Sequence, residues 1–167
     1  LGMPNYTSVS CESLLNLNLQ YTTISLAVSV PTNGFTPPGG PFGPPPSPVP
    51  VAFCRVAGVI KPTSVSKINF EVWMPPTATA WNGKYNGVGN GGLAGNISYS
   101  DMATAVGLGY ATASTDTGHV DPGFGAPQLW AIGHPYPPEL LIDFASRSIH
   151  LTAVDAKAII AAIYGQS

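Results

Sequence analysis

Residues 31–50 are the stretch of this chain that is least compatible with a helix or an interior strand. They contain nine prolines and four glycines in twenty residues. Proline has no backbone N–H to donate and its φ angle is fixed, so this tract cannot form a helix or an interior strand. We expect an extended connector laid over the surface, and the alternative is a polyproline II ligand for a partner's aromatic groove. The connector ends an N-terminal segment, 1–50, and a second part, 51–167, follows it.

The segments on both sides of the connector have the patterns of regular structure. Before it, residues 11–19 read as helical and residues 21–30 alternate apolar and polar side chains. After it, residues 52–60 and 66–75 alternate in the same way, as a hairpin of two half-buried strands would. The sequence therefore predicts an antiparallel hairpin directly after the connector.

Strands and helices alternate in the rest of the chain. A short strand over 85–89 leads into a glycine stretch, and a short helix with a serine as its N-cap candidate follows near 98–109. Residues 110–116 are small and apolar enough for an interior strand. A long helix is predicted over 139–163. One apolar stripe runs along it: Ile142, Ala145, Ile149, Ala153, Ala156, Ile160 and Ile163.

This order is that of the front half of an α/β sheet. A parallel sheet buried on both faces should continue with another strand, but here the pattern stops on a helix. We therefore expect an α/β fold that is incomplete without a following C-terminal segment.

Charge and cysteine content limit the partners and the compartment. With six Lys and Arg residues and a net charge of −2 there is no basic patch for nucleic acid, and no apolar run approaches a membrane span. Only 8% of residues are charged, and sequons begin at Asn5 and Asn96, so we expect a secreted glycoprotein whose signal peptide has been removed. In an oxidising compartment Cys11 and Cys54 would form one disulfide, and two buried free thiols are the alternative.

The glycine stretch over 87–95, "GVGNGGLAG", matches G-x-G-x-x-G, with Asp116 placed like the ribose-binding acid of a dinucleotide site. That reading requires a helix to begin at the third glycine. Eight residues, 93–100, intervene before helical periodicity begins, so the dinucleotide reading fails. Bare glycine N–H groups serve equally well as the oxyanion hole of an α/β-hydrolase, whose glycine-rich loop also follows a strand.

Four long blocks now identify a resemblance. They are "FCRVAGVIKPTSVSKINFEVWMPP", "WNGKYNGVGNGGLAG", "STDTGH" and "ELLIDFASRSIHLTAVDAKAIIAAIYG". Together they strongly resemble the fungal tannase and feruloyl esterase family, over about residues 52–165. The resemblance implies an α/β-hydrolase fold with a lid inserted later in the chain. It also implies a Ser–Asp–His triad whose Ser and His each neighbour a cysteine, the two cysteines being bonded to each other.

In that family the nucleophile lies in a Cys-Ser-x-Gly-Gly segment shortly after the long helix. The resemblance therefore puts the whole triad after Ser167 and no catalytic residue in this chain. It assigns the oxyanion hole to Gly91 and Gly92, and it supports a Cys11–Cys54 bridge.

The remaining polar candidates are few. Asp116 and His119 of "DTGH" either border the substrate pocket or make hydrogen bonds that fix the loop. Their cluster with Asp121 is too irregular to predict a metal site, and no cofactor is expected. His134 and His150 read as structural.

Two functions follow from the resemblance and the composition. The first is the N-terminal part of a secreted serine esterase that cleaves phenolic-acid esters such as feruloyl or galloyl esters. Its partner would be a C-terminal segment or chain carrying the nucleophile and the lid. The alternative is a non-catalytic secreted domain that binds plant phenolics or a partner chain.

Overall fold

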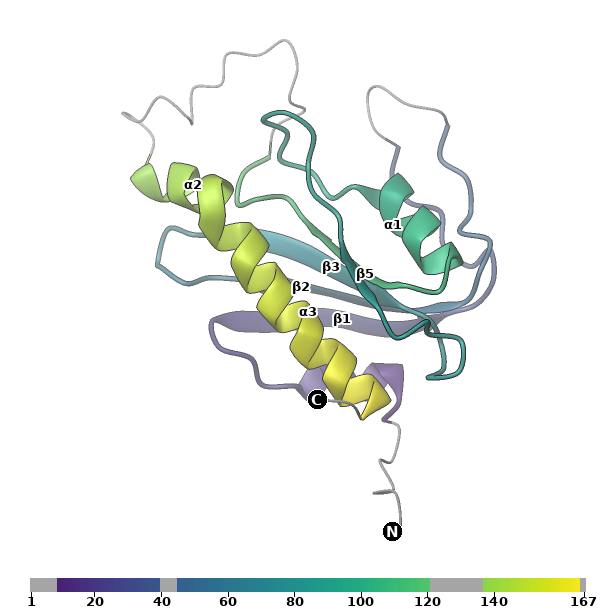
Figure 1. Ribbon diagram of the computed structural model, residues 1–167. Coiled ribbons are helices and arrows are strands. Elements are labelled where there is room, and N and C mark those ends of the chain that lie inside the picture. The colour runs from purple at the N-terminus through teal and green to yellow at the C-terminus, as the bar shows by residue number, and fades with distance from the viewer. Residues whose placement is uncertain (1–8, 40–44, 121–136, 166–167) are drawn as a thin grey trace.

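The computed structural model describes residues 9–39, 45–120 and 137–165 (Figure 1). Five strands form one sheet in the order β1-β2-β3-β5-β4. Neighbouring strands are antiparallel except β4 and β5, which are parallel. The strands are β1 (Thr22–Val30), β2 (Phe53–Ile60), β3 (Ile68–Met74), β4 (Tyr85–Gly87) and β5 (Ala111–Thr115). The predicted hairpin, β2–β3, and the predicted interior strand, β5, are both confirmed.

The helical segments also follow the expected order. A 3-10 helix, η1 (Cys11–Asn16), precedes β1, and α1 (Tyr99–Gly107) connects β4 to β5. The long C-terminal helix consists of α2 (Pro138–Ile142), a π-helical turn η3 (Asp143–Arg147) and α3 (Ser148–Tyr164). It ends at Gly165, whose φ of 65° is the left-handed conformation that favours glycine at a helix end. The sequence therefore predicted its extent well.

Helices cover both faces of the sheet, which makes this an α/β fold. Figure 1 shows α3 lying across one face of the sheet. Ile159 and Ile160 of α3 belong to the same buried cluster as Val56 and Val72 of the sheet. On the other face, Met102 and Val106 of α1 pack on Phe53 and Trp73. Alternate residues of β2 and β3 thus point into two separate cores, as the period of a strand requires.

The apolar stripe predicted along the long helix is wrong in its N-terminal half. Ala156, Ile160 and Ile163 are buried, but Ile142 and Ile149 are 44% and 48% exposed. The π-helical turn holds one residue more than a helical turn and rotates the face that meets the sheet. The side chains buried there are polar: Asp143, Ser148, Thr152 and Asp155.

The N-terminal segment is joined to the sheet by pairing and by a disulfide. β1 pairs with β2 along its length, and Cys11 of η1 is bonded to Cys54 of β2, with Cα atoms 5.6 Å apart. The alternative of two free thiols is therefore wrong. In the described parts of the connector, 31–39 and 45–50, there is neither helix nor strand, as predicted. Phe35 from this connector packs edge-on against Trp73.

Candidate active site

Two loops meet at one edge of the sheet. The glycine loop follows β4, and residues 116–120 follow β5. Because β4 and β5 are parallel, their carboxyl ends lie at the same edge, which is where α/β sheets bind ligands. Gly91, Gly92, Asp116 and His119, separated by up to 28 positions in the sequence, are therefore gathered in one region.

Gly91 and Gly92 form the outer end of the glycine loop. A turn closes there, with the Ala94 N–H donating to the Gly91 carbonyl oxygen at 3.1 Å. Gly92 has a φ of 57°, and at that position such a turn favours glycine. Neither glycine donates its own N–H to any residue that the structure describes. Both are exposed, and nothing lies within 4 Å of the place where a Cβ would stand. The two backbone N–H groups are thus without an acceptor among the described residues.

The base of the loop is fixed by side chains on both of its arms. The Asn90 amide donates to the carbonyl oxygens of Asn96, at 2.6 Å, and Thr115, at 3.1 Å. The Ser98 hydroxyl donates to the Gly89 carbonyl oxygen at 3.1 Å instead of capping α1. These hydrogen bonds join the two arms of the loop to each other and to the end of β5. They fix the position of the segment from which Gly91 and Gly92 extend.

His119 contacts the loop directly from the neighbouring segment. It is 8% exposed, its Nε2 lies 3.0 Å from the Leu93 carbonyl oxygen, and its Nδ1 lies 3.1 Å from the Thr117 hydroxyl oxygen. The backbone carbonyl of His119 lies so close to Gly95 that a Cβ at that position would overlap it. Gly95 is thus required for close approach of the two loops.

Asp116 is buried at the end of β5. Its carboxylate accepts hydrogen bonds from the Asn69 N–H at 2.9 Å, from the Asn69 side-chain amide and from the Gly118 N–H at 2.9 Å. Burial raises the pKa of this carboxyl, and the hydrogen bonds oppose that rise. These contacts hold the turn after β5 against β3. A role at the rim of a substrate pocket stays a prediction for Asp116 and for His119.

The described residues form two surface hollows. One, of about 390 Å³, runs between the outer edge of β4 and α1 and is lined in part by Asn86, Val88 and Asp101. The other, of about 430 Å³, lies beside the disulfide. Neither is lined by Gly91, Gly92, Asp116 or His119. Among the described residues, Gly91 and Gly92 are therefore exposed at the outer end of the glycine loop, whereas Val88 and Gly89 at its start line the first hollow.

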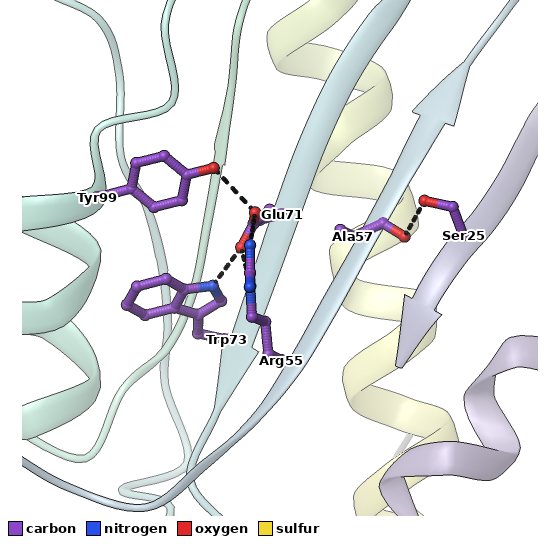
Figure 2. Close-up of polar contacts among 6 residues, drawn as sticks. All are labelled: Ser25, Arg55, Ala57, Glu71, Trp73 and Tyr99. Carbon is purple, nitrogen blue, oxygen red and sulfur yellow. Dashed lines mark hydrogen bonds and ion pairs between the residues drawn. The ribbon is translucent and has the colours of Figure 1, made fainter. Parts of the chain in front are cut away.

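A buried ionic cluster on the α1 face of the sheet escaped the sequence analysis (Figure 2). Glu71 is 4% exposed, and its carboxylate accepts from Arg55 at 2.6 and 2.8 Å, from the Trp73 indole at 2.7 Å and from the Tyr99 hydroxyl at 2.9 Å. Burial and the Glu71 charge raise the pKa of Tyr99, which keeps its hydroxyl a donor. The only sequence signal for this cluster was that Arg55 and Glu71 each interrupt one of the two predicted hairpin strands with a charged residue.

Some residues singled out in the sequence lie outside the described segments, and others lie away from Gly91, Gly92, Asp116 and His119 or are simply exposed. Asn5, Asp121 and His134 belong to segments that are not described. Asn96 is exposed beside the glycine loop, and His150 is exposed on α3. Within the described ranges there is no group of three or more His, Cys, Asp or Glu side chains that could hold a metal ion. None of the helices described there is long and apolar enough to cross a membrane.

The comparison with known proteins decides the family. The model of the family described as tannase and feruloyl esterase matches residues 54–167, which is more than half of the chain. The chain belongs to the tannase and feruloyl esterase family. The resemblance identified in the sequence is thereby confirmed.

Individual relatives in the tannase and feruloyl esterase family agree. An uncharacterised esterase of Xanthomonas campestris pv. campestris is 41% identical over 93% of this chain and 25% of its own length. A probable feruloyl esterase B-2 of Aspergillus flavus is 35% identical over 71% of this chain and 21% of its own length. The chain thus spans about a quarter of the length of these relatives.

Solved structures resemble the fold over nearly all of the chain. Feruloyl esterase B from Aspergillus oryzae has a TM-score of 0.74 at 31% identity, over 93% of this chain and 29% of that one. The tannin acyl hydrolase from Aspergillus niger has a TM-score of 0.63 at 21% identity, over 89% of this chain and 27% of that one, which supports the fold alone.

Proposed function

We propose that this chain is the N-terminal part of a secreted serine esterase that hydrolyses phenolic-acid esters, and that it supplies the oxyanion hole. The observation that carries the proposal is the pair of N–H groups of Gly91 and Gly92. They make no hydrogen bond to any described residue and stand at the carboxyl edge of two parallel strands. Exposed backbone donors on a fixed loop are what a developing oxyanion requires.

The chemistry is acyl transfer through a Ser–Asp–His triad located outside this chain. The serine oxygen would attack the ester carbonyl carbon while the histidine takes the hydroxyl proton and then gives it to the departing alcohol. Water would hydrolyse the acyl-enzyme by the same steps. In each step the negative charge on the former carbonyl oxygen would be stabilised by the N–H groups of Gly91 and Gly92.

The open side of the sheet supports an α/β-hydrolase fold completed by further chain. Among the described strands, β4 pairs only with β5, so its other edge can accept a parallel strand. The carboxyl end of such a strand would lie beside the glycine loop, which is where a nucleophile must lie to use the two donors. That this chain covers about a quarter of its relatives also favours a triad elsewhere.

The substrate class and the compartment rest on further observations. The family is described as tannase and feruloyl esterase, and a relative and a solved neighbour above 30% identity are named feruloyl esterases, which favours esters of phenolic acids. The Cys11–Cys54 disulfide fits an oxidising compartment, and the Asn96 sequon lies on an exposed loop. Both support secretion.

Replacing Gly92 tests the oxyanion assignment. Gly92→Val in the complete esterase puts a branched side chain at a φ of 57° and displaces the donor. We expect kcat on methyl ferulate to fall by about 10²-fold or more. Gly107→Val is the matched control, because nothing lies within 4 Å of a Cβ there and φ is ordinary. An unchanged kcat in Gly92→Val would remove the assignment.

Intact mass of the purified native protein tests the location of the triad. A longer polypeptide, or a second chain that co-purifies and carries the nucleophile, is the expected result. A lone and stable 17.2 kDa species without esterase activity would contradict the proposal and favour a non-catalytic domain.

A further inference from the structure

We infer that His119 is a positioning residue of the oxyanion hole, acting on the Gly92 N–H through two planar peptide groups that a hydrogen bond joins. This inference rests on the proposed esterase function and adds a residue to it. Its basis is the hydrogen bond between the His119 Nε2 and the Leu93 carbonyl oxygen, 3.0 Å apart.

The first peptide group is the one between Leu93 and Ala94. His119 holds its carbonyl oxygen, and its N–H donates to the Gly91 carbonyl oxygen at 3.1 Å. Because a peptide group is planar and stiff, fixing its two polar ends fixes its orientation. His119 thereby determines the direction in which the Ala94 N–H points.

The second peptide group is the one between Gly91 and Gly92. It carries the Gly91 carbonyl oxygen, which the Ala94 N–H holds, and the Gly92 N–H, which is left without a described partner. In a trans peptide these two groups point in opposite directions, so the orientation of one dictates the other. Displacing the Leu93 carbonyl therefore turns the Gly92 N–H away from its target.

The imidazole is itself held in place on several sides. The His119 Nδ1 lies 3.1 Å from the Thr117 hydroxyl oxygen, and in a neutral imidazole that carries its proton on Nε2, the Nδ1 accepts a hydrogen bond from that hydroxyl. The ring of Phe144, from η3, packs edge-on with its centroid 5.5 Å from that of His119. The Leu93 carbonyl can only accept, so the Nε2 must carry a proton for this bond to form. The loop is thus coupled to the long helix through one ring.

The glycine loop and the segment that carries His119 are also in direct backbone contact. Gly95 follows the turn, and a Cβ there would overlap the His119 carbonyl. The backbone of the glycine loop therefore lies directly on the segment that carries His119. The hydrogen bond from the imidazole is made between two backbones that already touch.

The test compares three replacements of His119 in the complete esterase. Gln places an amide N–H near the position of Nε2, Asn is too short to reach Leu93, and Phe keeps the ring against Phe144 without either nitrogen. We expect kcat on methyl ferulate to fall about tenfold or more in His119→Asn and His119→Phe, with KM changed less than about twofold. His119→Gln should retain kcat within about threefold.

A transition-state analogue separates positioning from general destabilisation. The inhibition constant of an arylboronic acid should rise in proportion to the loss of kcat in His119→Asn and His119→Phe, because the analogue presents an oxyanion that the substrate does not. The exposed His150→Asn on α3 is the control and should match the unchanged enzyme. His119→Phe keeps the test informative where His119→Asn fails to fold.

The outcomes distinguish this inference from the proposed function. Unchanged kcat in both His119→Asn and His119→Phe, with Gly92→Val impaired, overturns the role of His119 and leaves the oxyanion hole in place. Equal loss in Gln, Asn and Phe variants also overturns it, since the Nε2 bond would then not matter. An unaffected Gly92→Val contradicts the proposed oxyanion hole itself.

Discussion

The Glu71 carboxylate accepts both the Nε and the Nη2 hydrogens of Arg55, at 2.8 and 2.6 Å, and so forms a two-point ion pair between β3 and β2. The same carboxylate accepts the hydroxyl of Tyr99, the first residue of α1. Tyr99 follows Ser98, whose hydroxyl bonds the carbonyl of Gly89 in the glycine loop. The ion pair is therefore linked through Tyr99 and Ser98 to the start of the glycine loop, whereas His119 contacts Leu93 near its outer end.

Glu71→Gln should destabilise the protein strongly. It removes the charge that compensates Arg55, whose side chain is 19% exposed, and it leaves the cluster with an extra donor. Removing one partner of a buried ion pair lowers the free energy of unfolding by about 3–5 kcal/mol. We expect the lower value, about 3 kcal/mol, because the Arg55 side chain is partly exposed to water. Urea unfolding measures the loss. Tyr99→Phe, which removes one hydrogen bond, should cost about 1 kcal/mol, and an equal cost in both variants would contradict this account.

Gly118→Ala should destabilise the turn after β5. Gly118 has a φ of 84°, and a Cβ there would lie 2.9 Å from the Cβ of Asp143 and 3.3 Å from the Cγ1 of Ile68. Backbone strain and overpacking together should cost about 2 kcal/mol or more. The control is Gly107→Ala at the end of α1, which meets no atom within 4 Å and should be neutral or slightly stabilising. Thermal unfolding of the pair checks the difference, and equal midpoints would be the contrary result.

Replacing both Cys11 and Cys54 with Ala should lower the free energy of unfolding. The disulfide closes a loop with a sequence separation of 43. In the chain-entropy model this corresponds to about 4 kcal/mol. Unfolding of the double variant should resemble unfolding of the unchanged protein under reducing conditions. If reduction shifts the double variant as much as the unchanged protein, the loss does not come from this bond.

Asp155→Asn should reveal a pH-dependent contribution from a buried carboxyl. Asp155 is 6% exposed, and burial raises its pKa above the ordinary 3.8, against one hydrogen bond from the Thr22 hydroxyl at 2.6 Å. The folded protein then binds this proton more tightly than the unfolded chain does. The contribution of Asp155 to stability is therefore greatest below pH 3.8 and declines as the pH rises through the raised pKa.

The Asn side chain stays neutral, so the variant should gain stability relative to the unchanged protein at neutral pH and lose that gain in acid. Urea unfolding of both proteins between about pH 3 and pH 7 measures the difference. A difference that is constant over this range would show that the carboxyl is not perturbed by folding. Thr22→Val, which removes the one opposing hydrogen bond, should enlarge the pH dependence.

Local patterns predicted the elements of this fold well. Period-two alternation identified β2 and β3, and the small apolar residues before Asp116 identified β5 as interior. The side of the long helix that faces the sheet was not predictable, because the π-helical turn at Asp143 has no signature in the apolar spacing. That turn exposes Ile149, which the stripe would bury.

The site was predictable only in part. The sequence identified Gly91 and Gly92 by residue type and by family resemblance, and the parallel pairing of β4 with β5 brings His119 to the same edge. The bond from His119 to Leu93 spans 26 positions and depends on how two loops meet, which no local pattern encodes. The sequence could name His119 as a candidate but not the atom that it holds.

The most direct test of the central claim is the crystal structure of the complete esterase inactivated by an aryl phosphonate, whose oxygen stands in for the oxyanion. We expect the phosphoryl oxygen to lie about 2.7–3.1 Å from the backbone nitrogen of Gly92, with Gly91 beside it. A phosphoryl oxygen held by donors elsewhere, with the Gly92 N–H still facing solvent, would contradict the claim that this chain supplies the oxyanion hole.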